Sequence, residues 1–169
     1  MASARRVLGI DPGLATTGFG ILDGDGSAVQ VVASGAIRTR TRDARAARLA
    51  TLFEEISALI ELHAPQDLAI EQHFVAANVR SAMVIGEARA AAMIAASRGG
   101  LDVYEYPPAT VKESVCGFGG AAKEQVQAMV RVHLGLTVPP EPLDVSDALA
   151  VALTRLAALR MESLLAAPR

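Results

Sequence analysis

Two short apolar segments of this chain each end in an acid, and this feature most restricts the folds open to it. Residues 7–11 read VLGID and residues 67–71 read DLAIE. Runs of this length are typical of buried β-strands, where an acid is costly unless its lost hydration is compensated. Ligands of open α/β sheets bind beyond the carboxyl ends of the strands. Asp11 and Glu71 are therefore candidate site residues at such an edge.

Each of these acids also has a purely structural explanation. Asp11 is followed by Pro-Gly and could simply begin a turn, and Glu71 could pair with a nearby arginine. The stretch LGIDPGLATTGFG is open to two chemistries: a loop whose N–H groups cradle a phosphate, or a strand that ends in a metal-binding carboxylate. Strand alternation places Asp11 on the face of Gly9 and Glu71 on the face of Ala69. These small residues are expected to leave room for a cation or a substrate.

The rest of the chain alternates strand-like and helix-like segments. The sequence DGDG at 23–26 indicates a hairpin between two β segments. Apolar residues at helical spacing indicate an amphipathic helix across 42–64, and Pro65 marks its end. Further strands are expected over 67–72 and 101–106, and further helices over 78–98, 108–115, 121–135 and 144–167. This order predicts a single α/β domain spanning residues 1–169, with a mixed sheet that begins antiparallel and continues parallel.

Composition favours a folded soluble protein. Of the 169 residues, 51% are hydrophobic and 20% are charged, which supports a sizeable core. No apolar run reaches the ~18 residues that a membrane span needs, and the N-terminus lacks the apolar region of a signal peptide. Cys116 is the only cysteine, so a disulfide within the chain is excluded, and we expect it to be a small buried residue. The expected location is the cytoplasm, with no membrane association.

The charge distribution says more than the formal net charge of −2. Five arginines lie between residues 38 and 48, and such a cluster can create a local positive field. Taken alone, this run is better explained as a solvated strand end and first helical turn. The chain has only two lysines, Lys112 and Lys123, and both lie in one stretch.

A third acidic group opens the last expected helix, where Asp144 and Asp147 share one face. Helix capping would account for this pair by itself, with Asp144 as N-cap and Asp147 at N3. Together with the two strand-end acids, however, the pair can supply several hard oxygen ligands, which suit Mg²⁺ or Mn²⁺. Two such ions can clamp the attacking and leaving oxygens of a phosphodiester. No zinc-spaced His or Cys cluster, Walker A sequence or G-x-S-x-G motif competes with this interpretation.

Taken together, these motifs closely resemble the RuvC family of bacterial Holliday junction resolvases. The likeness runs from about residue 7 to about residue 159 and is carried by GIDPGLATTGFG, SGAIRT, AIEQHFVAANVRSAMVIGEARAA, YPPATVKESVCGFGGAAKEQVQAMV and DVSDALAVAL. IDPG alone is a weak signal, but IDPG, IEQ-x-F and D-x-x-DALA in this order and spacing are very specific. The resemblance implies a ribonuclease H-like fold, with a mixed five-stranded sheet flanked by helices.

The resemblance also implies roles for the acids. Asp11, Glu71, Asp144 and Asp147 match the family's four acidic active-site positions, which implies two divalent metal ions per subunit, Mg²⁺ or Mn²⁺. By analogy with the ribonuclease H scheme, Asp11 would be shared by both ions. Asp147 would hold the ion that activates water, and Glu71 the ion at the leaving 3′ oxygen. At the position of Asp144 some relatives carry a histidine.

DNA contacts are implied at five further positions. Phe74 matches an aromatic that stacks on unpaired bases at the junction centre, and a half-buried core residue is the alternative. Lys112 and Lys123 match two basic positions near the scissile phosphate. Arg40 and Arg42 lie in the arginine cluster, which varies more within the family, and are expected to contact the DNA backbone.

The implied activity is the resolution of four-way DNA junctions by paired, symmetric nicks that leave 5′-phosphate and 3′-hydroxyl ends. The implied partners are a second copy of the chain and the RuvA and RuvB branch-migration proteins. The homodimer would be built partly on the helix over 78–98, in which Ala82, Gly86 and Ala90 form a line of small residues. A helix that is apolar on most faces is expected to be buried on more than one side.

Two rival functions remain open. A nucleotide-dependent kinase or ATPase of the actin-like class uses a similar glycine-rich turn after an aspartate, but needs two such domains where this chain has room for one. A non-catalytic junction-binding module is the other rival, and the intact set of four acids argues against it.

Overall fold

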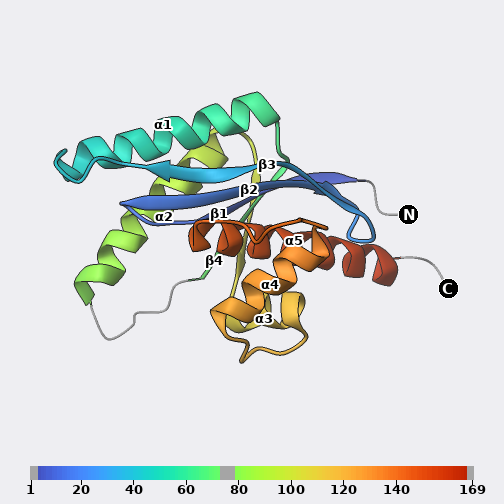
Figure 1. The fold of residues 1–169 in the computed structure, drawn as a ribbon. Coiled ribbons are helices and arrows are strands. Elements are labelled where there is room, and N and C mark those ends of the chain that lie inside the picture. The colour runs from blue at the N-terminus through green and yellow to red at the C-terminus, as the bar shows by residue number, and fades with distance from the viewer. Residues whose placement is uncertain (1–3, 73–78, 167–169) are drawn as a thin grey trace.

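The computed structural model describes residues 4–72 and 79–166. Its elements run along the chain as three strands, a helix, a strand, a helix, a strand and three helices (Figure 1). They are β1 (Arg5–Asp11), β2 (Thr16–Gly24), β3 (Val29–Arg38), α1 (Arg45–His63), β4 (Asp67–Glu71), α2 (Val79–Arg98), β5 (Asp102–Tyr106), α3 (Pro108–Cys116), α4 (Lys123–His133) and α5 (Leu143–Ala166). This order confirms the expected succession of elements.

The strands form one mixed five-stranded sheet in the order β3-β2-β1-β4-β5. Strands β1, β2 and β3 pair antiparallel, whereas β4 runs parallel to β1 and β5 parallel to β4. The predicted antiparallel start and parallel continuation are therefore confirmed. Because β1 and β4 are neighbours and parallel, their carboxyl ends meet at the same edge of the sheet.

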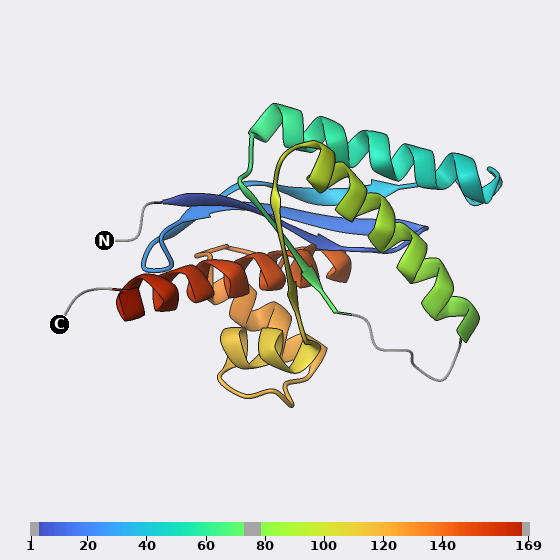
Figure 2. The same ribbon diagram turned by 180° about the vertical axis from the view of Figure 1, so that it is seen from behind.

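The helices cover both faces of this sheet (Figures 1 and 2). Helices α1 and α2 pack on one face, where buried Leu8, Ile10 and Ile70 belong to their core. Helix α5 lies across the other face with α3 and α4 packed against it, over a core that includes Val7 and Ala69. Within the described chain no helix is both long and apolar enough to cross a bilayer.

Glycines let α5 lie very close to the sheet. A Cβ atom at Gly9 would come within 2.1 Å of the Ala148 carbonyl oxygen, and one at Gly18 within 1.9 Å of the Asp144 carbonyl oxygen. The space beside Gly9 is thus filled by the helix, and Ala69 is fully buried, so the expectation that these small residues leave room for a cation is wrong. They instead bring the acids of α5 down onto the strand ends.

Helices α1 and α2 follow their sequence patterns with one difference. Helix α1 buries Leu52 and Ile56 and ends at His63, ahead of Pro65, as expected. Helix α2 buries one side through alanines 88, 91, 92, 95 and 96, while Met83 and Ile94 are 60% and 54% exposed. The chain by itself therefore covers α2 on one side only, not on more than one as expected.

Candidate active site

Asp11 and Glu71 lie side by side at the sheet edge. Ile10 of β1 is paired with Ile70 of β4 in the parallel register, so the acid that follows each of them falls at the same level. Both acids are half-buried. This register places both acids at the carboxyl edge of the sheet, where the strand pattern made them candidate site residues.

Helix α5 adds two more acids from above the sheet. The helix begins at Leu143, so Asp144 is its second residue and not the N-cap that the sequence suggested. Asp147 lies one turn further on, and its Oδ2 is 3.9 Å from Nζ of Lys123. The close approach of α5 at Gly18 is what places this first turn beside the end of β1.

A cavity of about 260 Å³ lies where these elements meet. It is lined by Asp11, Glu71 and Asp147, by both lysines of the chain, Lys112 and Lys123, and by Pro108, Val111, Val126 and Ala150. Asp144 is absent from this lining, although its charge acts on both Asp11 and Asp147. Three of the four predicted acids and both predicted lysines, from five different elements, thus share one cavity.

The acids in this cavity are not fully compensated by positive charge. Burial, followed by the charges of Asp147, Asp144 and Glu71, raises the pKa of Asp11 to about 7, and the charge of Lys123 opposes this only in part. Burial followed by the charge of Asp147 raises the pKa of Glu71, and burial is also the main reason that the pKa of Asp147 is raised. The raised carboxyl pKa values show that burial first, and the neighbouring acids second, disfavour the charged carboxylates more than the lysines stabilise them.

The donor chemistry of the cavity fits a hard divalent cation. Carboxylate oxygens are the ligands that Mg²⁺ and Mn²⁺ prefer, and a cation would stabilise the charged carboxylates that burial and mutual repulsion disfavour. In the described part of the chain, no three acidic, histidine or cysteine side chains lie close enough together to hold a metal ion as they stand. The carboxylates therefore surround the cavity from separate elements and would draw together around an ion.

The remaining predicted site residues lie elsewhere. Phe74 falls outside the described residues. Arg40 and Arg42 lie exposed between β3 and α1, away from the lining of the acidic cavity, and contact with DNA stays a prediction for both. Cys116 is partly exposed, not buried as expected.

The glycine-rich stretch after Asp11 also differs from expectation. One interpretation of this stretch was a loop whose backbone N–H groups approach a phosphate. Gly18 and Gly20 instead lie within β2, where a Cβ atom at Gly20 would clash with the side chain of Leu149 on α5. These glycines serve helix packing and do not form an open phosphate loop.

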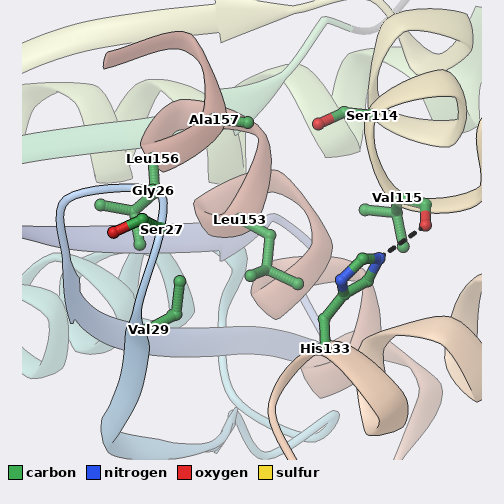
Figure 3. Close-up of a pocket in the computed structure, with 9 residues that line it drawn as sticks. All are labelled: Gly26, Ser27, Val29, Ser114, Val115, His133, Leu153, Leu156 and Ala157. Carbon is green, nitrogen blue, oxygen red and sulfur yellow. Dashed lines mark hydrogen bonds between the residues drawn. The ribbon is translucent and has the colours of Figure 1, made fainter. Parts of the chain in front are cut away.

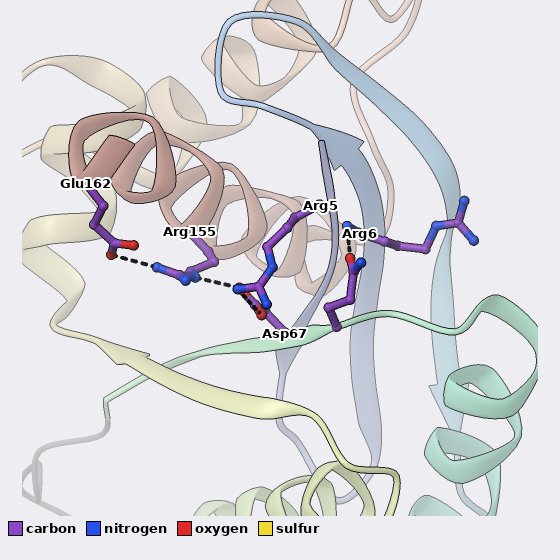
Figure 4. A network of polar contacts seen from close by, with 6 residues as sticks. Arg5, Arg6, Asp67, Arg155 and Glu162 are labelled. Carbon is purple, nitrogen blue, oxygen red and sulfur yellow. Dashed lines mark hydrogen bonds and ion pairs between the residues drawn. The ribbon is translucent and has the colours of Figure 1, made fainter. Parts of the chain in front are cut away.

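A buried ion-pair network that was not predicted lies at the opposite end of β4 (Figure 4). Asp67 is fully buried, and its Oδ2 accepts a 2.7 Å hydrogen bond from Nε of Arg155. Its Oδ1 accepts no well-aligned hydrogen bond but lies 3.2 Å from Nη1 of Arg5. Arg155 also contacts Glu162 at 2.9 Å and lies 3.5 Å from the ring centroid of Tyr104. An acid that begins an apolar strand was the available signal, but its partner is 88 residues away.

A second cavity, of about 200 Å³, lies near the β2–β3 loop and the C-terminal half of α5 (Figure 3). Its lining includes His133, Ser27 and Ser114, but no acid. The Nε2 of His133 donates a hydrogen bond to the carbonyl oxygen of Val115 at 2.9 Å, so that nitrogen cannot act as a base. The acidic cavity, with its three acids and two lysines, is therefore the better candidate for an active site.

Comparison with known proteins agrees with the fold. The sheet order, with helices on both faces and acids at neighbouring strand ends, defines an α/β protein of the ribonuclease H-like class. The family model for "Crossover junction endodeoxyribonuclease RuvC" matches residues 7–155. The chain belongs to the RuvC family.

Individual relatives show the same likeness. The RuvC of Heliobacterium modesticaldum is 46% identical over 147 residues, which cover 87% of this chain and 91% of the relative. The RuvC of Burkholderia ambifaria is 48% identical over 148 residues, covering 88% and 80%. The structure of Thermus thermophilus RuvC in complex with a Holliday junction substrate matches with a TM-score of 0.89 at 32% identity, covering 94% of this chain and 97% of that one.

Proposed function

We propose that this chain is a divalent-metal-dependent endonuclease that resolves Holliday junctions. The observation that carries the proposal is the acidic cavity, which gathers Asp11, Glu71 and Asp147 with both lysines of a RuvC-family chain. The substrate class follows from relatives that are named crossover junction endodeoxyribonucleases and from the Thermus thermophilus structure with a junction. Residues 1–169 would form a single nuclease domain.

The residues of the cavity have complementary roles in this proposal. Asp11, Glu71 and Asp147 would hold two divalent ions, with Asp144 adding negative charge beside them. Bound Mg²⁺ or Mn²⁺ would supply a low-pKa water nucleophile and stabilise charge on the phosphate. Lys112 and Lys123 line the same cavity and would offset the charge of the scissile phosphate.

The raised pKa of Asp11 supports this assignment. A carboxyl with a pKa of about 7 is partly protonated at neutral pH in the metal-free chain. A cation that binds there releases the proton and gains a charged ligand. Affinity for the ion is therefore expected to rise with pH as Asp11 ionises.

Dimerisation through α2 is part of the proposal. On this helix Val79, Met83 and Ile94 are exposed in the isolated chain, and a second copy could cover them. A two-fold dimer presents two equivalent cavities, as paired nicks in a four-way junction require. We also propose RuvA and RuvB as functional partners, which would bring the junction to this nuclease.

The rival function as a nucleotide-dependent kinase finds little support. Its glycine-rich loop would have to approach a nucleotide phosphate, but Gly18 and Gly20 are packed against α5. The fold instead offers the strand-end cavity, where acids outnumber lysines.

The test uses purified protein with a synthetic four-way junction and a linear duplex of the same sequence. Cutting of the junction should require Mg²⁺ or Mn²⁺, stop in EDTA, and leave nicks that a ligase can seal. Asp147→Asn should lose cutting while it still binds the junction. Asp102→Asn, an exposed acid at the start of β5, is the matched control and should cut normally. Equal cutting of the duplex, or cutting in EDTA, would contradict the proposal.

A further inference from the structure

The arginine cluster before α1 is divided by the fold. Arg45 and Arg48 line an open cavity of about 410 Å³ together with Arg80, which comes from the start of α2. The rest of the lining is Leu14, Ala15, Asp43 and Val84. Three arginines from two helices thus line one cavity, and its lining includes a single acid.

Two of these arginines are held in place by single hydrogen bonds. Nε of Arg48 donates to Oγ1 of Thr39 at 2.8 Å, and that hydroxyl donates in turn to the Leu14 carbonyl oxygen. Nε of Arg45 contacts Oε2 of Glu87 at 2.5 Å. The terminal nitrogens of both side chains have no partner among the described residues. Each guanidinium is therefore oriented but keeps free donors.

Positive charge prevails around this cavity. Arg80 is exposed and forms no ion pair with any described residue, and Arg40 and Arg42 in the adjoining loop are likewise unpaired within residues 4–72 and 79–166. Helix α1 has no acid in its first turn and no side-chain cap, so its N-terminal N–H groups add to the positive potential. Among the described residues, Asp43 is the one acid of the lining, and Glu87 pairs with Arg45 beside it.

We propose that this arginine cavity binds one phosphodiester group of the DNA backbone, at a linkage away from the cut. Guanidinium forks match phosphate oxygens in shape and charge. The inference rests on the proposed function, because it assumes that junction DNA lies at the adjacent acidic cavity.

The loop between β1 and β2 links the two cavities. Asp11 at its start lines the acidic cavity on the α5 side, while Leu14, three residues on, belongs to the core beneath α1 and α2 and lines the arginine cavity. A DNA strand that crosses this edge of the sheet would meet both. The arginines would then fix the register of the strand and leave the scissile phosphate to the acids.

The first test compares two double variants, R45Q/R80Q and R98Q/R160Q, in the Asp11→Asn background, where junction DNA stays uncut. Both lose the same charge, but Arg98 and Arg160 are exposed and distant from the cavity lining. For R45Q/R80Q the affinity for the junction should fall about 10-fold. The slope of log affinity against log salt should become shallower by about 1. The control should keep the wild-type slope, and equal slopes for the two variants would overturn the inference.

The second test neutralises single phosphates of the DNA and compares the wild type with R45Q/R80Q. Methylphosphonate is placed at one linkage of the junction at a time. At one linkage other than the cut, the methylphosphonate should weaken the affinity of the wild type for the junction. The same modification should not weaken the affinity of R45Q/R80Q any further. Fully additive losses at every linkage would overturn the inference. The inference would also be overturned if R45Q/R80Q lost binding of inorganic phosphate but kept the wild-type slope of log affinity against log salt for the junction.

Failure of this inference is distinguishable from failure of the proposed function. Junction cutting by the otherwise wild-type enzyme is measured in Mg²⁺ or Mn²⁺ alongside the binding assays. If it cuts and the R45Q/R80Q slope is unchanged, only the arginine cavity is wrongly assigned. If it does not cut, the endonuclease assignment itself is wrong.

Discussion

Strand β4 begins and ends with an acid, and the fold treats the two in opposite ways. Asp67 at the start is fully buried and lies between Arg155 and Arg5. Glu71 at the end lines a cavity with other acids, forms no ion pair among the described residues, and has a raised pKa because of burial and the charge of Asp147. Asp67, the paired acid, connects elements of the fold. Glu71, the unpaired acid, destabilises the fold, and a bound ligand can relieve this effect.

The paired acid is part of a network that reaches three neighbouring elements. Burial alone would lower the pKa of Arg155, but hydrogen bonds from its guanidinium to Asp67 and Glu162 outweigh burial and raise it. The network connects the amino end of β4 with α5 and β5. Since α5 also carries Asp144 and Asp147, the network helps to fix the helix that delivers those acids.

The largest effect is expected for Glu71→Gln. The substitution keeps the shape of the side chain but removes a charged oxygen ligand, so junction cleavage should fall by at least about 100-fold. The free energy of unfolding should stay the same or rise, because the variant no longer buries a charge and no longer repels Asp147. Cleavage assays and urea unfolding measure the two effects. If Glu71→Gln cuts normally, or mainly loses stability, Glu71 does not differ from Asp67 in the way proposed.

Arg155→Met should reverse this pattern. Asp67 would remain buried without its main partner, at a cost of about 3–5 kcal/mol in the free energy of unfolding. Urea unfolding measures this loss. Arg160→Met on the exposed side of the same helix is the control and should lose less than about 1 kcal/mol. Adding Asp67→Leu to Arg155→Met should restore much of the loss, and no recovery would show that the ion pair is not what the first variant removed.

The pH dependence of stability isolates Asp11 in the metal-free protein. Its pKa is raised from the ordinary aspartate value of 3.8 to about 7, so the folded chain binds more protons than the unfolded chain between these values. The free energy of unfolding should therefore decrease as pH rises from about 4 to about 7, by an amount on the order of 3 kcal/mol, and then level off. Asp11→Asn should remove most of this decrease. Urea unfolding in EDTA at several pH values measures it, and an unchanged slope in the variant would contradict the assignment.

Lys123→Gln should give the smallest effect on stability. The side chain is 69% exposed and its Nζ is 3.9 Å from Asp147, so the loss in unfolding free energy should stay below about 1 kcal/mol. Lys123 lowers the pKa of Asp11, Glu71 and Asp147; without it these values should rise further. Junction cleavage is expected to fall about 10-fold as positive charge leaves the site. Matched assays on Lys112→Gln, the other lysine of the cavity, show whether the two act alike.

The sequence was sufficient for the elements and for most of the site because both leave local patterns. Strand-end acids, helical spacing and hairpin turns are short-range signals, and they placed Asp11 and Glu71 correctly at one edge. The pairing of Asp67 with Arg155 is long-range and has no local signature. Gly9 had two possible explanations, because a missing side chain can make room for an ion or for a closely packed helix.

If the acidic cavity cuts junction DNA with divalent metal, loss of the Asp11 carboxylate should separate cleavage from binding, so Asp11→Asn is the decisive variant. Binding and cleavage of one synthetic four-way junction are measured for the variant and the wild type, in Mg²⁺ and in Mn²⁺. Asp11→Asn should bind the junction almost normally, with cleavage abolished in both metals. Cleavage by Asp11→Asn at the wild-type rate in either metal would contradict this expectation.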